Sequence, residues 1–407
     1  MGINKIFSTE NLTLIAIFVG ILVGLYLPEV AFSLKVIGDL FLATLKMLIV
    51  PLIFASIFVA IAGLGSVNEL KNLGAKALIY YFVTTSLAVG LGVIVVNIID
   101  AGSDSSLVMS QFGDKVGEAV HIKEFSIDQF ILSFVPTNLF QSLTNGSIIQ
   151  IIFFVVLFSV ATLYIEEEKK QTLFNFFDSL NETMMVVAKW IIKLTPIGVF
   201  SLVAFVIAEK GIDVLFSLWE YVISVLLALF LHAFATLPFL FFLVTKENPY
   251  LYFLKVREAV LLAFSTASSS ATLPISIEIS QEKGDVSKKV SGFVLPLGAT
   301  VNMDGTALYE SIAVLFIANL AGVDLSLSQQ ILIFVTATLA SIGAAGIPGA
   351  GIVMMVVVLD SVGLPHEYIP VILVVDRILD MFRTATNVWG DLLGTKLLNH
   401  IYLKNHK

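Results

Sequence analysis

Long apolar segments separated by short polar ones dominate the N-terminal part of the chain. A helix that crosses a bilayer needs about 20 apolar residues. Two segments, 36–64 and 127–164, exceed this length, so we expect them to tilt, bend or break, with Pro51 and Pro136 as natural break points. Residues 100–125 form the longest polar stretch and are predicted to be an aqueous loop. The predicted spans are 11–29, 36–64, 75–99, 127–164, 182–208 and 213–245.

The C-terminal part shows a different pattern, which occurs twice. The apolar segments 251–281 and 327–362 are interrupted at their centres by "STASSSATLP" and "SIGAAGIPGAG". Each is followed by an apolar helix that carries charge, over 287–318 and 365–402. Interrupted segments in corresponding positions of two halves indicate a transporter binding site. Irregular backbone at membrane depth must be buried by protein or face a cavity, so we expect two re-entrant hairpins. The alternative is two ordinary spanning helices with flexible kinks.

Composition supports a membrane protein. The 407 residues are 57% hydrophobic and 13% charged, whereas a soluble protein has about 25% charged residues. The absence of cysteine excludes disulfides, thiolate metal sites and cysteine nucleophiles. The net charge is −8 and no basic patch suggests a nucleic-acid partner. If the N-terminus is cytoplasmic, most lysines and arginines near the span ends fall on the cytoplasmic side of the membrane. This assignment requires each interrupted segment to return to the side from which it entered.

The last predicted helix has one polar face. Asp376, Asp380, Arg383, Asn387 and Asp391 are spaced by 4, 3, 4 and 4 residues, and at about 100° per residue they fall within an arc of roughly 80°. A charge at the bilayer centre costs at least ~2.5–3.5 kcal/mol, so intramembrane ionisable residues mark a site by default. The alternative is a structural ion-pair network. Because carboxylates outnumber arginines on this face, we expect another cation to bind there.

The stretch "GATVNMDGTALYE" (298–310) predicts a second polar site. Asn302, Asp304 and Thr306 surround a glycine in an apolar helix, where glycine costs about 1 kcal/mol in helicity. Local unwinding would free carbonyl oxygens, which together with a carboxylate suit an alkali cation; the alternative is a kink with a hydrogen-bonded aspartate. Glu310 points away from Asp304 on the helix, either as a proton carrier or as a paired acid.

Three further motifs are weaker evidence for a binding site when each is taken alone. The serines of "ASSSATLP" could bind an anionic group at a half-helix end, or form an ordinary turn. The stretch "GIPGAG" permits close backbone approach and hinge motion. Tyr81, Thr84 and Thr85 share neighbouring positions of the third span.

Together these motifs resemble the dicarboxylate/amino acid:cation symporter family, which includes the excitatory amino acid transporters and archaeal aspartate transporters. The matching stretches are "SSSATLP", "LPLGATVNMDGTALYE", "ASIGAAGIPGAG" and "VDRILDMFRTATNVWGD". The resemblance covers essentially the whole chain and is most specific over 263–395. It implies an all-α integral membrane protein with eight transmembrane helices, two re-entrant helical hairpins and inverted repeats. It also implies a homotrimer that works as an elevator-type transporter.

The resemblance further divides the chain into a scaffold and a mobile transport domain. Scaffold helices one and two would occupy 1–72, transport-domain helix three 73–99, an extracellular loop 100–125, and scaffold helices four and five 126–210. The rest of the transport domain would occupy 211–407: helix six, hairpin one (251–281), helix seven (287–318), hairpin two (327–362) and helix eight (365–402).

The family's substrate site carries over residue by residue. Arg383 would bind the side-chain carboxylate of the substrate, which suits bidentate guanidinium geometry, and Asp380 would bind the α-ammonium. Arg383 therefore favours aspartate or glutamate, and Asp380 argues against succinate or malate, which lack an ammonium. The remaining substrate-binding residues would be Ser268, Ser269, Met303, Thr306, Gly346, Ile347, Gly351, Thr384 and Asn387.

Three sodium sites carry over as well, with Na+ as the co-transported ion. The first would comprise Gly298, Asn302, Asn387 and Asp391, the second Thr300, Ser341, Ile342 and Ala344, and the third Tyr81, Thr84, Thr85, Asn302 and Asp304. Proton-coupled bacterial members tend to have asparagine where Asp391 stands, so Asp391 favours sodium.

The chain also departs from the family's pattern. Glu310 matches the acid assigned to proton co-transport in animal members. Those members and the archaeal ones place an additional arginine at the positions of Met381 or Ala267, whereas here Arg377 is the extra base. Coupling to protons or potassium and the role of Arg377 therefore stay open.

We expect a sodium-coupled symporter for acidic amino acids in the cell membrane, with lipid and two further copies of the chain as partners. The alternatives are a proton-coupled glutamate/aspartate or dicarboxylate symporter and a channel with a polar-lined pore. An intramembrane enzyme would need a nucleophile–base or metal pair. His232 is the one histidine within the six spans predicted between residues 11 and 245, and we expect no histidine near the polar face.

Overall fold

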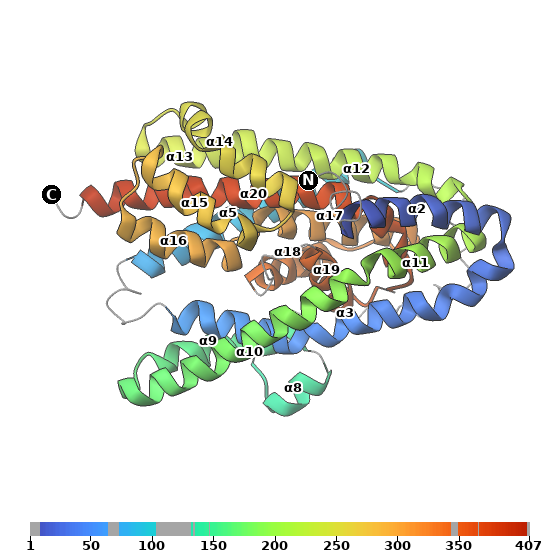
Figure 1. The fold of residues 1–407 in the computed structure, drawn as a ribbon, viewed down its shortest axis with the longest axis horizontal. Helices are drawn as coiled ribbons and strands as arrows, with labels where there is room; N and C mark the ends of the chain where they lie inside the picture. The colour runs from blue at the N-terminus through green and yellow to red at the C-terminus, as the bar shows by residue number, and fades with distance from the viewer. Residues whose placement is uncertain are drawn as a thin grey trace, which may run out of the picture.

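The computed structural model describes residues 9–63, 73–102, 132, 135–145, 147–342, 349–364 and 366–404. Every regular element in these ranges is helical (Figure 1). The first part of the chain forms α2 (Thr9–Tyr26), α3 (Pro28–Ala62), α5 (Ala75–Ile99), α8 (Leu139–Asn145), α9 (Ile148–Thr162), α10 (Glu167–Lys193) and α11 (Thr195–Lys210). The second forms α12 (Asp213–Leu231), the π-helical turn η2 (His232–Thr236), α13 (Leu237–Thr245), α14 (Pro249–Thr266), α15 (Ser269–Glu282), α16 (Lys288–Val301), α17 (Asp304–Leu320), α18 (Leu327–Ile342), α19 (Ala350–Val362), the 3-10 turn η3 (His366–Tyr368) and α20 (Ile369–Lys404).

Three helical segments of the described ranges are long and apolar enough to cross a membrane: Pro28–Ala62, Ala75–Ile99 and Leu218–Thr245. The last of these runs from α12 through η2 into α13. A fourth span results if α10 and α11 are taken as one bent pair. Helix length and composition therefore support a multi-pass membrane protein, while the number of eight spans stays a prediction.

One predicted span and one predicted break point differ from the structure. Residues 182–208 are not one helix, because α10 ends at Lys193 and α11 starts at Thr195 with a bend of 49°. Pro196 explains this break, since it lies in the first turn of α11 and lacks the N–H that would continue the hydrogen bonds of α10. By contrast, α3 runs for 35 residues straight through Pro51. Neighbouring helices in a membrane protein can compensate for the lost hydrogen bond.

The interruptions predicted in the C-terminal part are confirmed where the structure describes them. Between α14 and α15, Ala267 adopts a left-handed φ of 47° and the Ser268 hydroxyl then caps α15 by accepting from the backbone N–H of Ala271 at 3.2 Å. Between α16 and α17, the helix is unwound at Asn302 and Met303. Between α18 and α19, residues 343–348 lie outside the described ranges.

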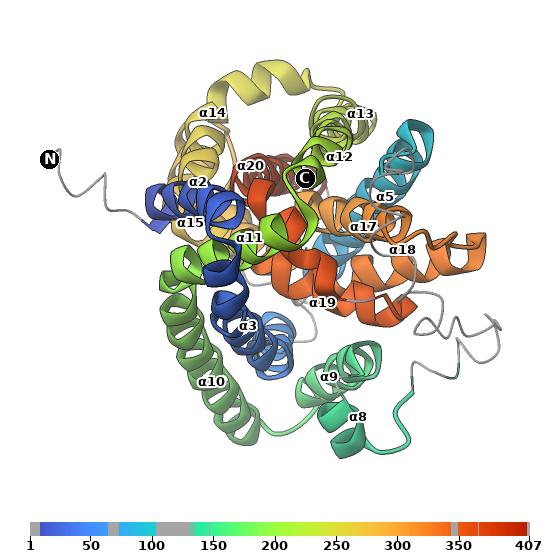
Figure 2. The same cartoon turned by 90° about the vertical axis from the view of Figure 1, so that its right-hand side faces the viewer.

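Helices far apart in the sequence meet around α20, which lies among the C-terminal helices (Figure 1). It packs against α14, α16 and α17, and α17 is buried along nearly its whole length. From the N-terminal part, α5 packs against α17, α12 and α18, as Figure 2 shows for α17 and α18. On another side, α11 packs against both α2 and α3. The polar residues predicted on α5, α17 and α20 thus meet in the interior.

Candidate functional site

Arg383 and two aspartates of the same helix, α20, form a buried ion cluster. The guanidinium is fully buried; it donates from Nη1 to Asp376 Oδ1 at 2.9 Å and from Nη2 to Asp380 Oδ1 at 2.7 Å. A buried charge needs such partners, because removing one side of a buried ion pair costs about 3–5 kcal/mol. The predicted polar face of this helix is therefore confirmed for these three residues.

Two neighbouring helices fix the position of the Arg383 guanidinium. The ring of Tyr309 on α17 lies below it, with its centroid 3.8 Å from Cζ. On α19, a side chain at Gly351 would place its Cβ 3.1 Å from Nη1. The aromatic face attracts the cation when water is excluded, and the glycine leaves the space beside it open. Tyr309 and Gly351 thus hold the guanidinium of Arg383 in one position between α17, α19 and α20.

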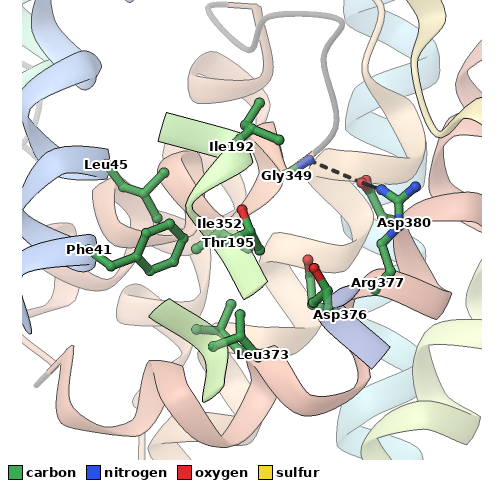
Figure 3. A pocket seen from close by; sticks show the side chains of 12 residues that line it. Phe41, Leu45, Ile192, Thr195, Gly349, Ile352, Leu373, Asp376, Arg377 and Asp380 are labelled. Atoms are coloured by element: carbon green, nitrogen blue, oxygen red, sulfur yellow. Dashed lines mark hydrogen bonds and ion pairs between the residues drawn. The ribbon is translucent and has the colours of Figure 1, made fainter. Parts of the chain in front are cut away.

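Asp380 lines a small cavity between α19, α20 and the helices α2, α3, α10 and α11, and its Oδ2 lies on the side of Gly349 (Figure 3). This oxygen accepts from the backbone N–H of Gly349 at 3.0 Å, and Nη1 of Arg377 lies 3.7 Å from it. The cavity volume is about 60 Å³, with Asp376, Arg377 and Asp380 as its charged wall. Arg377, whose role the sequence left open, therefore belongs to the same ion cluster.

Asn387 connects α20 with the unwound segment before α17. Its Oδ1 accepts from the backbone N–H of Gly305 at 2.7 Å, and its Nδ2 contacts Met303 Sδ at 3.3 Å and Thr306 Oγ1 at 3.2 Å. Gly305 has to be a glycine, because a Cβ there would collide with the backbone of Arg383. The predicted substrate-binding residues Met303, Thr306 and Asn387 thus lie together, next to the Arg383 cluster.

A second buried cluster, made mainly of oxygen atoms, lies between α5, α17 and α20. Asp304 Oδ1 accepts from Thr85 Oγ1 at 2.7 Å and from Thr84 Oγ1 at 3.2 Å. Asn302 Nδ2 donates to Asp391 Oδ1 at 2.9 Å. All five side chains are buried. Two carboxylates at this depth need positive charge nearby, and hydroxyl, amide and carboxylate oxygens are the donors that hard cations prefer.

Gly298 shapes the space inside this cluster. A Cβ at Gly298 would collide with the carboxylate of Asp391 and lie 2.8 Å from the hydroxyl of Tyr81. That hydroxyl donates to the carbonyl of Val294 at 2.8 Å, which fixes its position. Among the described residues, no group of three or more His, Cys, Asp or Glu side chains could hold a metal ion. Hydroxyl, amide and carbonyl groups would therefore supply most ligands of any cation here.

His232 corrects the expectation that no histidine lies near the polar face. Its Nε2 lies 3.2 Å from Asp304 Oδ2, and the imidazole is completely buried. The residue begins η2, the π-helical turn between α12 and α13, and such turns are frequent at functional sites. Because His232 and Asp304 are 72 residues apart, no spacing rule could have connected them.

Glu310 lies one helical turn beyond this region on α17. Its side chain is fully buried, and neither carboxyl oxygen has a hydrogen-bond partner among the residues that the structure describes. A buried ionised carboxylate without a hydrogen-bond partner is very unfavourable. Of the two readings of Glu310, the structure thus argues against a paired acid.

The other predicted site residues are less closely connected. Ser268 and Ser269 are buried at the start of α15, a helix that packs against α20. Thr384 is buried on α20. The Thr300 hydroxyl donates within α16 to the Leu297 carbonyl, and the Ser341 hydroxyl within α18 to the Thr338 carbonyl. Ala344, Gly346 and Ile347 lie outside the described ranges, and of Ile342 only the backbone is described.

Comparison with known proteins gives whole-chain matches. The profile of the sodium:dicarboxylate symporter family matches residues 11–401. The chain is 34% identical over 393 residues to the proton/sodium-glutamate symport protein of Bacillus caldotenax, covering 94% of this chain and 93% of the relative. It is 36% identical over 410 residues to the proton/glutamate-aspartate symporter of Escherichia coli, covering 97% and 93%. It is 34% identical over 452 residues to excitatory amino acid transporter 3 of the rabbit Oryctolagus cuniculus, covering 96% and 85%.

Proposed function

Because the chain belongs to the sodium:dicarboxylate symporter family, we propose that it takes up aspartate or glutamate together with sodium ions. It is a multi-pass protein of the cell membrane, as the long apolar helices and the membrane-protein relatives agree. The relatives are acidic amino acid symporters by name, so the activity is transport rather than a chemical reaction.

The observation that carries the choice of substrate is the buried Arg383 between Asp376 and Asp380. A guanidinium held at this depth can bind the side-chain carboxylate of an acidic amino acid in a bidentate way. Asp380, which lines the cavity, would receive the α-ammonium. Asn387, Thr306, Thr384 and the backbone near Gly351 would complete the site, with the Ser268–Ser269 helix start and residues 346–347 holding the α-carboxylate.

The oxygen cluster supports the choice of ion. The hydroxyls of Thr84 and Thr85, which donate to Asp304, still have lone pairs to offer a cation. Sodium bound beside Asp304 and Asp391 would neutralise two buried carboxylates without requiring protonation. The three sodium sites would use the residues that the family resemblance assigns to them, with Thr300 and the end of α18 at the second.

Glu310 favours a second candidate, coupling to protons. Its carboxyl group is buried and has no hydrogen-bond partner among the described residues, so no ion pair accounts for it. Two of the relatives named above are proton-coupled by name. In this version of the proposal, Glu310 carries a proton in addition to, or instead of, one of the sodium ions.

For the assembly and movement, we propose the arrangement of the family. The helices within 1–72 and 126–210 would form a trimeric scaffold, and 73–99 with 211–407 would move across the membrane like an elevator. The close packing of α5 on α17 and of α11 on α2 and α3 is compatible with these two groups.

Substitution of Arg383 tests the proposal. Arg383→Gln in proteoliposomes should reduce uptake of labelled L-aspartate and L-glutamate at least about hundredfold, because it removes one side of a buried ion cluster. Arg257→Gln, which changes an exposed arginine on α14, is the matched control and should transport normally. Intact acidic amino acid uptake by a folded Arg383→Gln protein would refute the assignment.

The driving ion is tested in the same vesicles. Uptake should require an inward sodium gradient and should persist without a pH gradient. Uptake driven by a pH gradient alone, without sodium, would replace the sodium-coupled proposal by the proton-coupled one, and Glu310→Gln should then abolish it.

A further inference from the structure

Asp380 shares its charge between two arginines of its own helix. Its Oδ1 is bound by Arg383 at 2.7 Å, whereas its Oδ2 faces Arg377 at 3.7 Å and the N–H of Gly349 at 3.0 Å. Figure 3 shows Arg377 and Asp380 side by side next to Gly349. The side chains of Arg377 and Asp380 are 15% and 8% exposed, so water screens their interaction only partly. The oxygen that would receive an incoming ammonium therefore already lies beside a guanidinium.

Among the described residues, the cluster pairs two carboxylates with two guanidinium groups. Asp376 and Asp380 supply two negative charges, and Arg377 and Arg383 supply two positive charges. The neighbouring cavity of about 60 Å³ has room for about two water molecules at ~30 Å³ each. An α-ammonium can thus reach Asp380 only by displacing water and sharing the carboxylate with Arg377.

We propose that Arg377 is a specificity-determining residue: as the counter-ion of Asp380 it disfavours substrates with an α-ammonium relative to dicarboxylates without one. This inference rests on the proposed function, since it concerns the substrate site assigned above. An acidic amino acid brings an ammonium into repulsion with Arg377. A C4-dicarboxylate such as succinate brings two carboxylates and no ammonium, and the same guanidinium attracts it.

The size of the effect follows from the distances. Two like charges a few ångströms apart in a partly buried site change affinity by about tenfold or more. The 15% exposure of Arg377 places the expected effect at the lower end of this range. Because Arg383 remains bound to both aspartates, neutralising Arg377 leaves the carboxylate-binding group in place.

Competition binding tests the inference. The affinities for L-aspartate and succinate are measured at one fixed sodium concentration for the purified wild type, Arg377→Gln, Arg377→Lys and Arg257→Gln. Arg377→Gln should shift the aspartate-to-succinate preference about tenfold towards aspartate. Arg377→Lys retains the charge and should restore the wild-type ratio, and Arg257→Gln should not change it.

Each outcome decides a different point. An unchanged ratio in Arg377→Gln, or a shift towards succinate, overturns the role of Arg377 while the proposed transport of aspartate stands. Failure of the wild type to bind either acid overturns the proposed function itself. If Arg377→Gln does not yield folded protein in size-exclusion chromatography, Arg377→Met, which keeps the apolar stem, is measured against the same criterion.

Discussion

At the residue scale, one missing side chain defines the space of the oxygen cluster. Gly298 lies on α16 against the carboxylate of Asp391 and the hydroxyl of Tyr81. Gly298→Ala would force these oxygens apart, and we expect the affinity for sodium to fall about tenfold or more, because interiors tolerate added volume poorly. The measurement is a sodium titration of aspartate binding.

The same helix offers a matched control for this change. A methyl group added at Gly292 would have no other atom within 4 Å, so Gly292→Ala should leave sodium binding unchanged and gain up to ~1 kcal/mol of helix propensity. Equal sodium affinity in Gly298→Ala and in the wild type would show that the cation binds elsewhere.

The sequence predicted the residues that lie on one helix better than those that meet across helices. The spacing of Asp376, Asp380 and Arg383 was enough to place them on one face, and the structure confirms it. The contact of His232 with Asp304 depends on how α12 and α17 pack, which helical periodicity does not contain. The 3.7 Å approach of Arg377 to Asp380 depends on side-chain conformation as well.

At the scale of elements, an ion pair joins α14 to the turn between α15 and α16. Lys255 Nζ lies 2.9 Å from Asp285 Oδ2. This ammonium holds the pKa of Asp285 below its usual range. Since the pKa is lower in the folded protein, the carboxylate stabilises the fold above its unfolded pKa. That contribution is lost as the pH falls through the folded pKa.

Asp285→Asn tests this ion pair without changing the turn, because asparagine also tolerates the left-handed φ of 55° found there. Both side chains are more than half exposed, so we expect a loss below ~1 kcal/mol at neutral pH. The thermal unfolding midpoints of the two proteins should converge in acid. Lys255→Gln should give the same loss, and a constant difference at every pH would contradict the pairing.

Helix breaks were predicted well where polar or small residues cause them. The turns at Ala267–Ser268 and Asn302–Met303 follow from such residues, and both are present. Proline alone was a poor guide. Pro51 lies inside a continuous α3, whereas Pro196 marks the break before α11. The difference comes from packing, since α11 turns to contact both α2 and α3, and local sequence does not encode that.

At the scale of the whole molecule, the proposed substrate and cation sites share the segment 302–306. The Asn302 amide donates a hydrogen bond to Asp391, and the Asp304 carboxylate accepts one from Thr85 of α5. The backbone N–H of Gly305 donates to Asn387. A ligand that orders this segment for one site therefore orders it for the other. We expect sodium to raise the affinity for aspartate about 5- to 150-fold, and aspartate to raise that for sodium by the same factor.

Asn387→Ala should reduce this coupling factor, measured by titrating each ligand with and without the other. Asn319→Ala is the control, because Asn319 lies farther along α17 and donates to the Ala101 carbonyl instead. Undiminished coupling in Asn387→Ala would mean that the two sites communicate by another route.

Composition and apolar length were enough to predict a helical, multi-pass membrane protein. They could not predict how the helices pack against one another, because an apolar residue facing lipid and one facing protein look the same in sequence. On α5, for example, Tyr81 is buried, whereas Ile79, two positions before it, is 63% exposed.

The π-helical turn η2 also fixes the number of residues between α12 and α13. The carbonyls of Ala233 and Phe234 accept from Trp389 Nε1 and the Tyr250 hydroxyl. Deleting one residue there would rotate α12 against α13 by about 100° and carry His232 away from Asp304. Homologues that keep this histidine contact are therefore expected to tolerate substitutions in 233–236 but neither insertions nor deletions in 232–236.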